Sequence, residues 1–126
     1  MITITLPWPS SALSPNGRDR WAKIEATKPT LEIAAYLTAQ AGYFHFAKQP
    51  AGVRLEVVFH KPNRRRMDID NLVGRMKSVQ DGVFLALGWD DRIICEATYR
   101  MGQVIPGGQV VMTITGIVEE IMGRME

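Results

Sequence analysis

The strongest periodic pattern in the chain is an apolar stripe along residues 70–87. At about 100° per residue, five apolar side chains fall on one side of a helix in this segment: Leu72, Met76, Val79, Val83 and Leu87. Gly88 follows where a glycine commonly ends a helix. A second helix is expected over residues 29–47, where apolar residues also recur near helical spacing. Both helices need a core to cover their apolar sides.

Alternating apolar and polar residues predict strands at 2–6 and 53–60, because side chains along a strand point to opposite faces in turn. Residues 92–100 and 109–118 are rich in strand-forming types. The Gly- and Pro-containing segment 101–108 is expected to join these two as a long hairpin loop.

The resulting order, β-α-β-α-β-β, predicts an α+β fold with two helices packed on a small mixed sheet of about four strands. A length of 126 residues suits a single domain, residues 1–126, that buries roughly two-thirds of its unfolded surface. Residues 118–126 form a short amphipathic tail, either a final helical turn or a frayed end.

Several classes of protein are excluded by simple counts. No apolar run approaches the ~20 residues that cross a membrane, and the start of the chain lacks the basic residues of a signal peptide. Cys95 is the single cysteine, which excludes disulfides within the chain and a cysteine-based metal site. We expect a reduced, cytoplasmic setting, no membrane partner and no organic cofactor.

The formal net charge of +2 conceals a segregation along the chain. Residues 1–77 carry 12 Lys and Arg against 6 Asp and Glu, whereas residues 78–126 carry 3 against 7. Within 61–77, six basic residues accompany only Asp68 and Asp70. Such asymmetry favours an anionic partner.

Carboxylates gather around the same segment. Asp68 and Asp70 would point to one side of the chain if residues 68–70 were extended, and Asp90 and Asp91 follow the predicted helix. Two carboxylates that face one point repel each other unless a cation lies between them. Oxygen ligands of this kind suit a hard dication such as Mg²⁺.

Four residues form a line along the predicted helix on the side away from its apolar stripe: Asp70, Gly74, Lys77 and Asp81. Since helical side chains lean toward the N-terminus, Lys77 is expected to extend toward Asp70, with Asp81 one turn later to orient it. A glycine inside a helix costs ~1 kcal/mol relative to alanine. Clearance for Lys77, or close approach of a phosphate, would explain Gly74.

Each feature also has a structural explanation. Asp70 and Asn71 are able to cap a helix, and a Lys77–Asp81 ion pair is ordinary on a surface. The Asp90–Asp91 pair suits a turn, and the arginine run 64–66 suits a solvated loop. Trp8, Trp21 and Trp89 are expected to anchor loops on the core, although Trp21 lies in a basic segment. The joint occurrence of these features in one short span favours a functional site.

Three motifs resemble the RusA family of Holliday junction resolvases, small endonucleases of phages and prophages. They are RRRMDIDNL at 64–72, LGWDDRII at 87–94 and LPWPSSALSPNGRDRW at 6–21. The resemblance implies a homodimeric nuclease that depends on Mg²⁺, with Mn²⁺ as a possible substitute. It also implies resolution of branched DNA, the four-way junction, by paired symmetric nicks during recombination and repair in a bacterial or phage-infected cell.

The resemblance also assigns residues. Asp68, Asp70 and Asp91 match the family's catalytic, metal-binding carboxylates. The best-studied form of the family has a catalytic lysine one turn after the second Asp, where this chain has Gly74. Lys77 is the expected substitute and Arg75 the alternative. Met67 stands where that form has a basic residue.

DNA phosphates are expected to bind the basic residues that surround this site: Lys61, Arg64, Arg65, Arg66 and Arg75, with a second contact at Arg18, Arg20 and Lys23. One alternative is a catalytically silent protein of the same fold that binds junctions or regulates. Another is a nuclease for flaps, forks or ordinary duplex.

Overall fold

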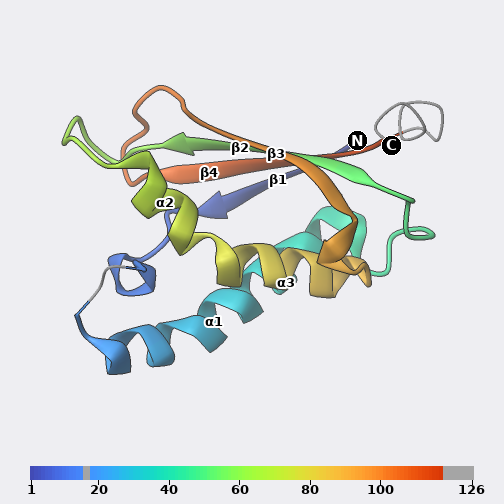
Figure 1. Cartoon of the computed structure of the whole chain (residues 1–126), viewed down its shortest axis with the longest axis horizontal. Helices are drawn as coiled ribbons and strands as arrows, with labels where there is room; N and C mark the ends of the chain where they lie inside the picture. Colours follow the sequence, from blue (N-terminus) through green and yellow to red (C-terminus); the bar gives the residue numbers. More distant parts are fainter. Residues whose placement is uncertain (16–17, 118–126) are drawn as a thin grey trace.

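Four strands form one mixed sheet in the order β1-β4-β2-β3 (Figure 1). The computed structural model describes residues 1–15 and 18–117. The strand bounds are β1 Ile2–Pro7, β2 Val53–His60, β3 Ile94–Met101 and β4 Gln109–Gly116. β4 runs antiparallel to both β1 and β2, and β2 and β3 are parallel. A parallel pair needs a long crossover connection, and the helices between β2 and β3 supply it.

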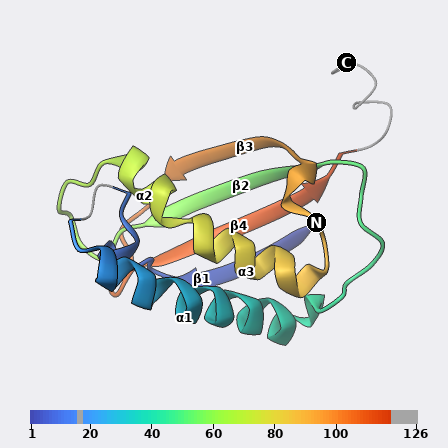
Figure 2. The same cartoon turned by 60° about the horizontal axis from the view of Figure 1, so that its bottom comes forward.

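The helices all lie on one face of the sheet (Figure 2). Their bounds are α1 Arg20–Thr38, α2 Ile69–Arg75 and α3 Lys77–Leu87. Shorter helical turns are η1 Ser11–Leu13, η2 Ala39–Tyr43, which is a π-helical turn, and η3 Asp91–Ile93. Among the described residues, no helix has the length and apolar character needed to span a bilayer.

The core lies between the sheet and the helices. Every second residue of β1, β2 and β4 is buried, and the apolar side chains of α2 and α3 meet them. Leu55, Phe59, Leu72 and Val83 are among the fully buried members. The α+β class and the mixed four-stranded sheet are therefore confirmed.

The helix predicted over 70–87 is two helices. Met76, with φ −83° and ψ −8°, ends α2 and precedes α3. Its N–H donates to the Val73 carbonyl at 3.0 Å, a bond that tightens the last turn of α2. The apolar stripe continues across the break, which is why periodicity alone does not reveal it.

The helix predicted over 29–47 begins at Arg20 and contains Pro29. Asp19 caps it by accepting a hydrogen bond from the Ala22 N–H at 3.0 Å. All of its first ten residues are exposed or only half-buried, so no apolar stripe marks them. The helical run ends at η2, where Gly42 has φ 95°, a conformation that favours glycine.

The predicted hairpin between the last two strands is wrong. β2 lies between β3 and β4 in the sheet, so residues 101–108 cross from an edge strand to a central one. The predicted strands at 92–100 and 109–118 are observed as β3 and β4. The tail at 118–126 lies outside the described residues.

Candidate functional site

Asp68 and Asp70 meet at the start of α2. Asp68 has an extended backbone and caps the helix, because its Oδ1 accepts a hydrogen bond from the Asp70 N–H at 2.9 Å. Asp70 lies in the first helical turn, where the partial positive charge of the helix end favours a carboxylate. Both residues are exposed. The expected extended 68–70 segment is not present, since the helix already begins at Ile69.

Asp90 and Asp91 have different partners in the turn that leads into β3. Asp90 caps η3 through the Arg92 N–H at 2.9 Å, and Arg92 Nη2 approaches its Oδ2 at 2.6 Å. These hydrogen bonds from Arg92, first from the side chain and then from the backbone, lower the pKa of Asp90 to about 2. Asp91 instead faces α3, where its carboxylate meets a lysine.

Lys77 is the link between α3 and the Asp91 turn. Its Nζ lies 3.0 Å from Asp81 Oδ1 and 3.4 Å from Asp91 Oδ2. The hydrogen bond and charge of Asp81, followed by those of Asp91, raise the pKa of Lys77 above its ordinary value. The side chain is 70% exposed and its acceptors about one-third exposed. Lys77 therefore points toward Asp81 and Asp91, and not toward Asp70 as the continuous helix predicted.

Arg75 and Asn71 fasten α2 to the loop that follows β1. Arg75 Nε donates to Asn71 Oδ1 at 3.0 Å, and its Nη1 donates to the Pro9 carbonyl at 3.3 Å. Asn71 in turn donates from Nδ2 to Ser14 Oγ. Burial lowers the pKa of the Arg75 guanidinium. Both side chains are thus engaged in joining two segments of the chain.

Gly74 is covered by Pro15. A Cβ placed on Gly74 would lie 2.5 Å from Cγ and 2.7 Å from Cδ of Pro15. A side chain at this position would overlap a rigid ring. The predicted reasons for Gly74, clearance for Lys77 or approach of a phosphate, are therefore replaced by packing against Pro15.

The basic loop between β2 and α2 is ordered by its own polar groups. Lys61 Nζ donates to the Arg65 carbonyl at 3.0 Å, and the Arg65 N–H donates to Asn63 Oδ1 at 2.9 Å. Arg64, Arg65 and Arg66 are exposed. Within residues 1–15 and 18–117, none of these three guanidinium groups has an ion-pair partner.

The start of α1 lies at the same end of the molecule as the basic loop in both views (Figures 1 and 2). Arg18, Arg20 and Lys23 are exposed there. Trp8 and Trp89 anchor loops as expected: Trp8 packs edge-on against Phe59, and Trp89 Nε1 donates to the Ala47 carbonyl at 3.1 Å. Trp21 does not, because it is 75% exposed.

The carboxylates have the donor chemistry that a hard dication requires. In the part of the chain that the structure describes, however, no three His, Cys, Asp or Glu side chains lie close enough together to hold a metal ion. The fold brings Asp68 next to Asp70, and Asp91 next to Lys77 and Asp81. It does not bring all three predicted ligands into one cluster.

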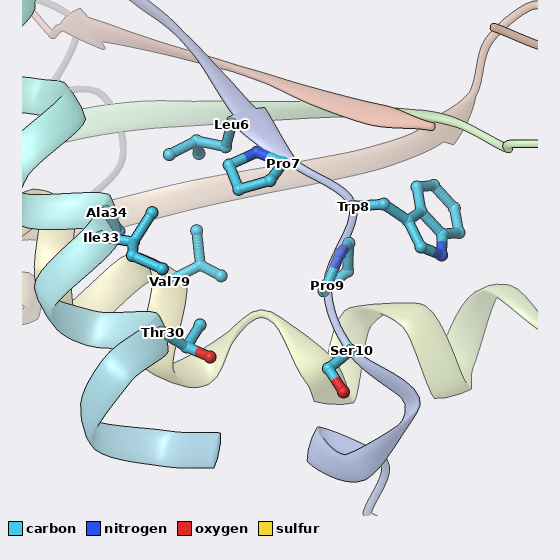
Figure 3. Close-up of a pocket in the computed structure, with 9 residues that line it drawn as sticks. All are labelled: Leu6, Pro7, Trp8, Pro9, Ser10, Thr30, Ile33, Ala34 and Val79. Carbon is cyan, nitrogen blue, oxygen red and sulfur yellow. The ribbon is translucent and has the colours of Figure 1, made fainter. Parts of the chain in front are cut away.

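An apolar cavity of about 210 Å³ lies between the end of β1, the following loop, α1 and α3 (Figure 3). Leu6, Ile33 and Val79 line it together with Pro9 and Ser10 of the loop. None of its lining residues is a predicted site residue. Asp68 and Asp70 lie where the chain leaves the end of β2 and enters α2, whereas Asp91 lies at the opposite end of the sheet, where β3 begins.

Comparison with known proteins places the chain in a family. An uncharacterized protein of Xylella fastidiosa is 38% identical over 122 residues, which cover 95% of this chain and 80% of that protein. The crossover junction endodeoxyribonuclease RusA of Escherichia coli O139:H28 is 31% identical over 94% of this chain and 97% of its own length. The RusA of E. coli K12 is 32% identical over 118 residues, which cover 90% of this chain and 92% of that protein. No family model matches the chain.

The chain belongs to the RusA family. The sequence did not reveal that Pro15 and Ser14 hold α2 in place. Both act by contacts with α2 across more than fifty positions of the chain, and no local pattern encodes such contacts. The Ser-Pro-Asn-Gly segment indicated only a turn.

Proposed function

We propose that this RusA-family chain is a Mg²⁺-dependent, structure-specific endodeoxyribonuclease that resolves four-way DNA junctions by paired symmetric nicks in the cytoplasm. RusA relatives that carry the name crossover junction endodeoxyribonuclease match 90–94% of the chain. The observation that carries the proposal is the Lys77–Asp91 contact at 3.4 Å. This contact places the Lys77 ammonium beside Asp91 of the LGWDDRII motif, although 14 positions of the chain separate the two residues.

The proposed metal ligands are Asp68, Asp70 and Asp91, whose oxygens suit Mg²⁺ and also Mn²⁺. When bound, such an ion activates a water and offsets charge on the scissile phosphate. Asp68 and Asp70 are both exposed. Within the described residues, their carboxylates accept one hydrogen bond, which uses a single oxygen of Asp68 and leaves the others to face an ion. Asp90 is unsuited as a metal ligand, because its carboxylate already forms an ion pair with Arg92.

Lys77 would stabilise negative charge on the phosphate or on the leaving oxygen. Two carboxylates raise the pKa of its ammonium, so the group stays charged at any physiological pH. Asp81 holds that ammonium at 3.0 Å. This arrangement favours Lys77 over Arg75, whose guanidinium is tied to Asn71 and Pro9.

The exposed guanidinium groups of Arg64, Arg65 and Arg66, together with Lys61, would bind phosphates that flank the cut. Such contacts position DNA without reading its sequence. Arg18, Arg20 and Lys23, exposed at the start of α1, would supply a second contact. Arg75 would act mainly by holding α2 in place, with its charge adding to the same basic field.

A junction with two-fold symmetry needs two sites, so we propose that the protein acts as a two-fold homodimer. Light scattering of the purified protein at several concentrations tests this part. A mass of twice 14.1 kDa supports it, and a monomer that still makes paired nicks contradicts it.

The alternative is a catalytically silent protein that binds junctions. The lack of a three-carboxylate cluster among the described residues favours it. An end-labelled junction incubated with Mg²⁺ or Mn²⁺ separates the two proposals. Paired nicks support the nuclease, whereas tight, salt-sensitive binding without cleavage supports the silent protein.

A further inference from the structure

Trp21 lies on the outer side of the first turns of α1 with 75% of its surface exposed. Ile24, one turn later, is 61% exposed. Residues three apart on a helix are neighbours, so these two side chains form one apolar patch. A large apolar patch that a fold leaves in water usually marks a contact surface.

Basic residues surround the patch. Arg20 and Lys23 line a shallow groove with Ile24 and Pro15, and Arg18 precedes the helix. Asp19 is occupied as the helix cap, which leaves Glu25 as the nearby acidic side chain on these turns. An aromatic side chain within a basic surface suits a nucleic-acid strand, because bases stack on the ring while cations bind the phosphates.

The patch is also placed beside the proposed cleavage site. Pro15, which lines the groove, packs directly on Gly74 of α2. Asp68 caps the start of α2, and Asp70 lies in its first turn. A strand that runs from the carboxylates across the groove would reach Trp21 after crossing α2.

We propose that Trp21 stacks on an unpaired base at the branch point of the DNA, with Arg20 and Lys23 binding the adjoining phosphates. This inference rests on the proposed function. It adds a contact that would make the protein bind branched DNA more tightly than linear DNA. A base inside a duplex is already stacked on both faces. Trp21 would therefore contribute to junction binding and little to duplex binding.

Binding of the full-length protein to a four-way junction and to a linear duplex of the same sequence, both in EDTA, tests the proposal. Trp21→Ala is expected to weaken junction binding about 5- to 150-fold and to change duplex binding by less than about twofold. Trp21→Phe should retain most of the junction affinity. In the wild type, 2-aminopurine at the branch point should be quenched, and Trp21→Ala should abolish that quenching.

Tyr36→Ala is the matched control. Tyr36 is also an exposed aromatic residue on α1, 60% exposed, about 22 Å farther along the helix. It should bind the junction as the wild type does. Equal losses for Trp21→Ala and Tyr36→Ala would indicate a general effect on α1 and contradict the proposal.

Three other results would overturn the inference alone, provided that the wild type cleaves junctions in Mg²⁺. They are an unchanged junction affinity in Trp21→Ala, an equal loss on junction and duplex, and a changed molecular mass, which would make Trp21 a contact between copies. A wild type that neither binds nor cleaves junctions overturns the proposed function itself.

Discussion

Pro15 packs on Gly74 so closely that a Cβ on residue 74 would lie 2.5 Å from the proline Cγ. Gly74 occupies the place where the best-studied form of the family is expected to have its lysine. A lysine there would displace Pro15 and, with it, the loop whose Ser14 binds Asn71. The packing of one loop therefore accounts for the absence of a side chain at residue 74, and Lys77 is the cation that we propose in its place.

Gly74→Ala should destabilise the protein. In an open helix the change would add up to about 1 kcal/mol of stability, but overlap with a rigid ring costs typically ~1–3 kcal/mol. Urea unfolding measures the difference. The double variant Pro15→Ala/Gly74→Ala should recover stability relative to Gly74→Ala, and a single variant more stable than the wild type would contradict this packing account.

Lys77→Ala should slow junction cleavage more than Arg75→Ala. Removal of a group that stabilises transition-state charge typically costs ~100- to 1000-fold. Arg75→Ala should instead lower stability by about 1–3 kcal/mol, because it removes the donor to Asn71 Oδ1 and to the Pro9 carbonyl. Single-turnover cleavage by both variants checks the predicted order of rates, and urea unfolding of both variants checks the predicted loss of stability in Arg75→Ala. The reverse order of cleavage rates would exclude Lys77 as the proposed cation.

The pKa of Lys77 should fall toward its ordinary value of 10.5 in Asp81→Asn, because the Asp81 hydrogen bond is the largest cause of the raised pKa. A raised lysine pKa contributes stability below pH 10.5 that is lost as pH rises through the folded pKa. Titration of the lysine side-chain NMR signals measures the shift. An Asp81→Asn pKa equal to that of the wild type would show that the ion pair is absent in solution.

Asp90 and Asp91 should differ in titration and in activity. Asp90, with its pKa lowered to about 2, should stay ionised until pH falls well below 3.8, its ordinary value. Its contribution to stability is present above pH 3.8 and is lost as pH falls through about 2. NMR titration should show the Asp90 pKa rising toward 3.8 in Arg92→Ala.

Substitution separates the two acids by function. Asp91→Asn should abolish cleavage, whereas Asp90→Asn should mainly loosen the η3 turn that Asp90 caps. Cleavage assays of the two variants at one Mg²⁺ concentration make the comparison. Loss of cleavage in Asp90→Asn alone would reverse the assignment within the pair.

Sequence patterns predicted the strands well because alternation reports directly which side of a strand is buried. The pairing of those strands was not predictable in the same way. β4 inserts between β1 and β2, and this order depends on contacts across the whole chain. The start of α1 was missed for another reason, since residues 20–28 are solvated and carry no apolar stripe.

The candidate site was likewise predictable from the sequence only in part. Composition and spacing singled out the acidic pairs, the arginine run and Lys77 as a group of interest. The break at Met76 changes the direction in which Lys77 points, and the return of the chain along α3 brings Asp91 to it. The exposure of Trp21 was equally hidden, because sequence shows that a tryptophan is apolar but not whether the fold covers it.

The most direct test of the account is cleavage of a mobile four-way junction, end-labelled on each strand in turn, by wild type, Asp70→Asn and Asp91→Asn in Mg²⁺. We predict symmetric nick pairs on opposite strands with the wild type and none with either variant, while both variants still bind the junction. Variants that nick as fast as the wild type would contradict the assignment of these carboxylates. Binding without nicks by the wild type in either Mg²⁺ or Mn²⁺ would contradict the proposal that the protein is a nuclease.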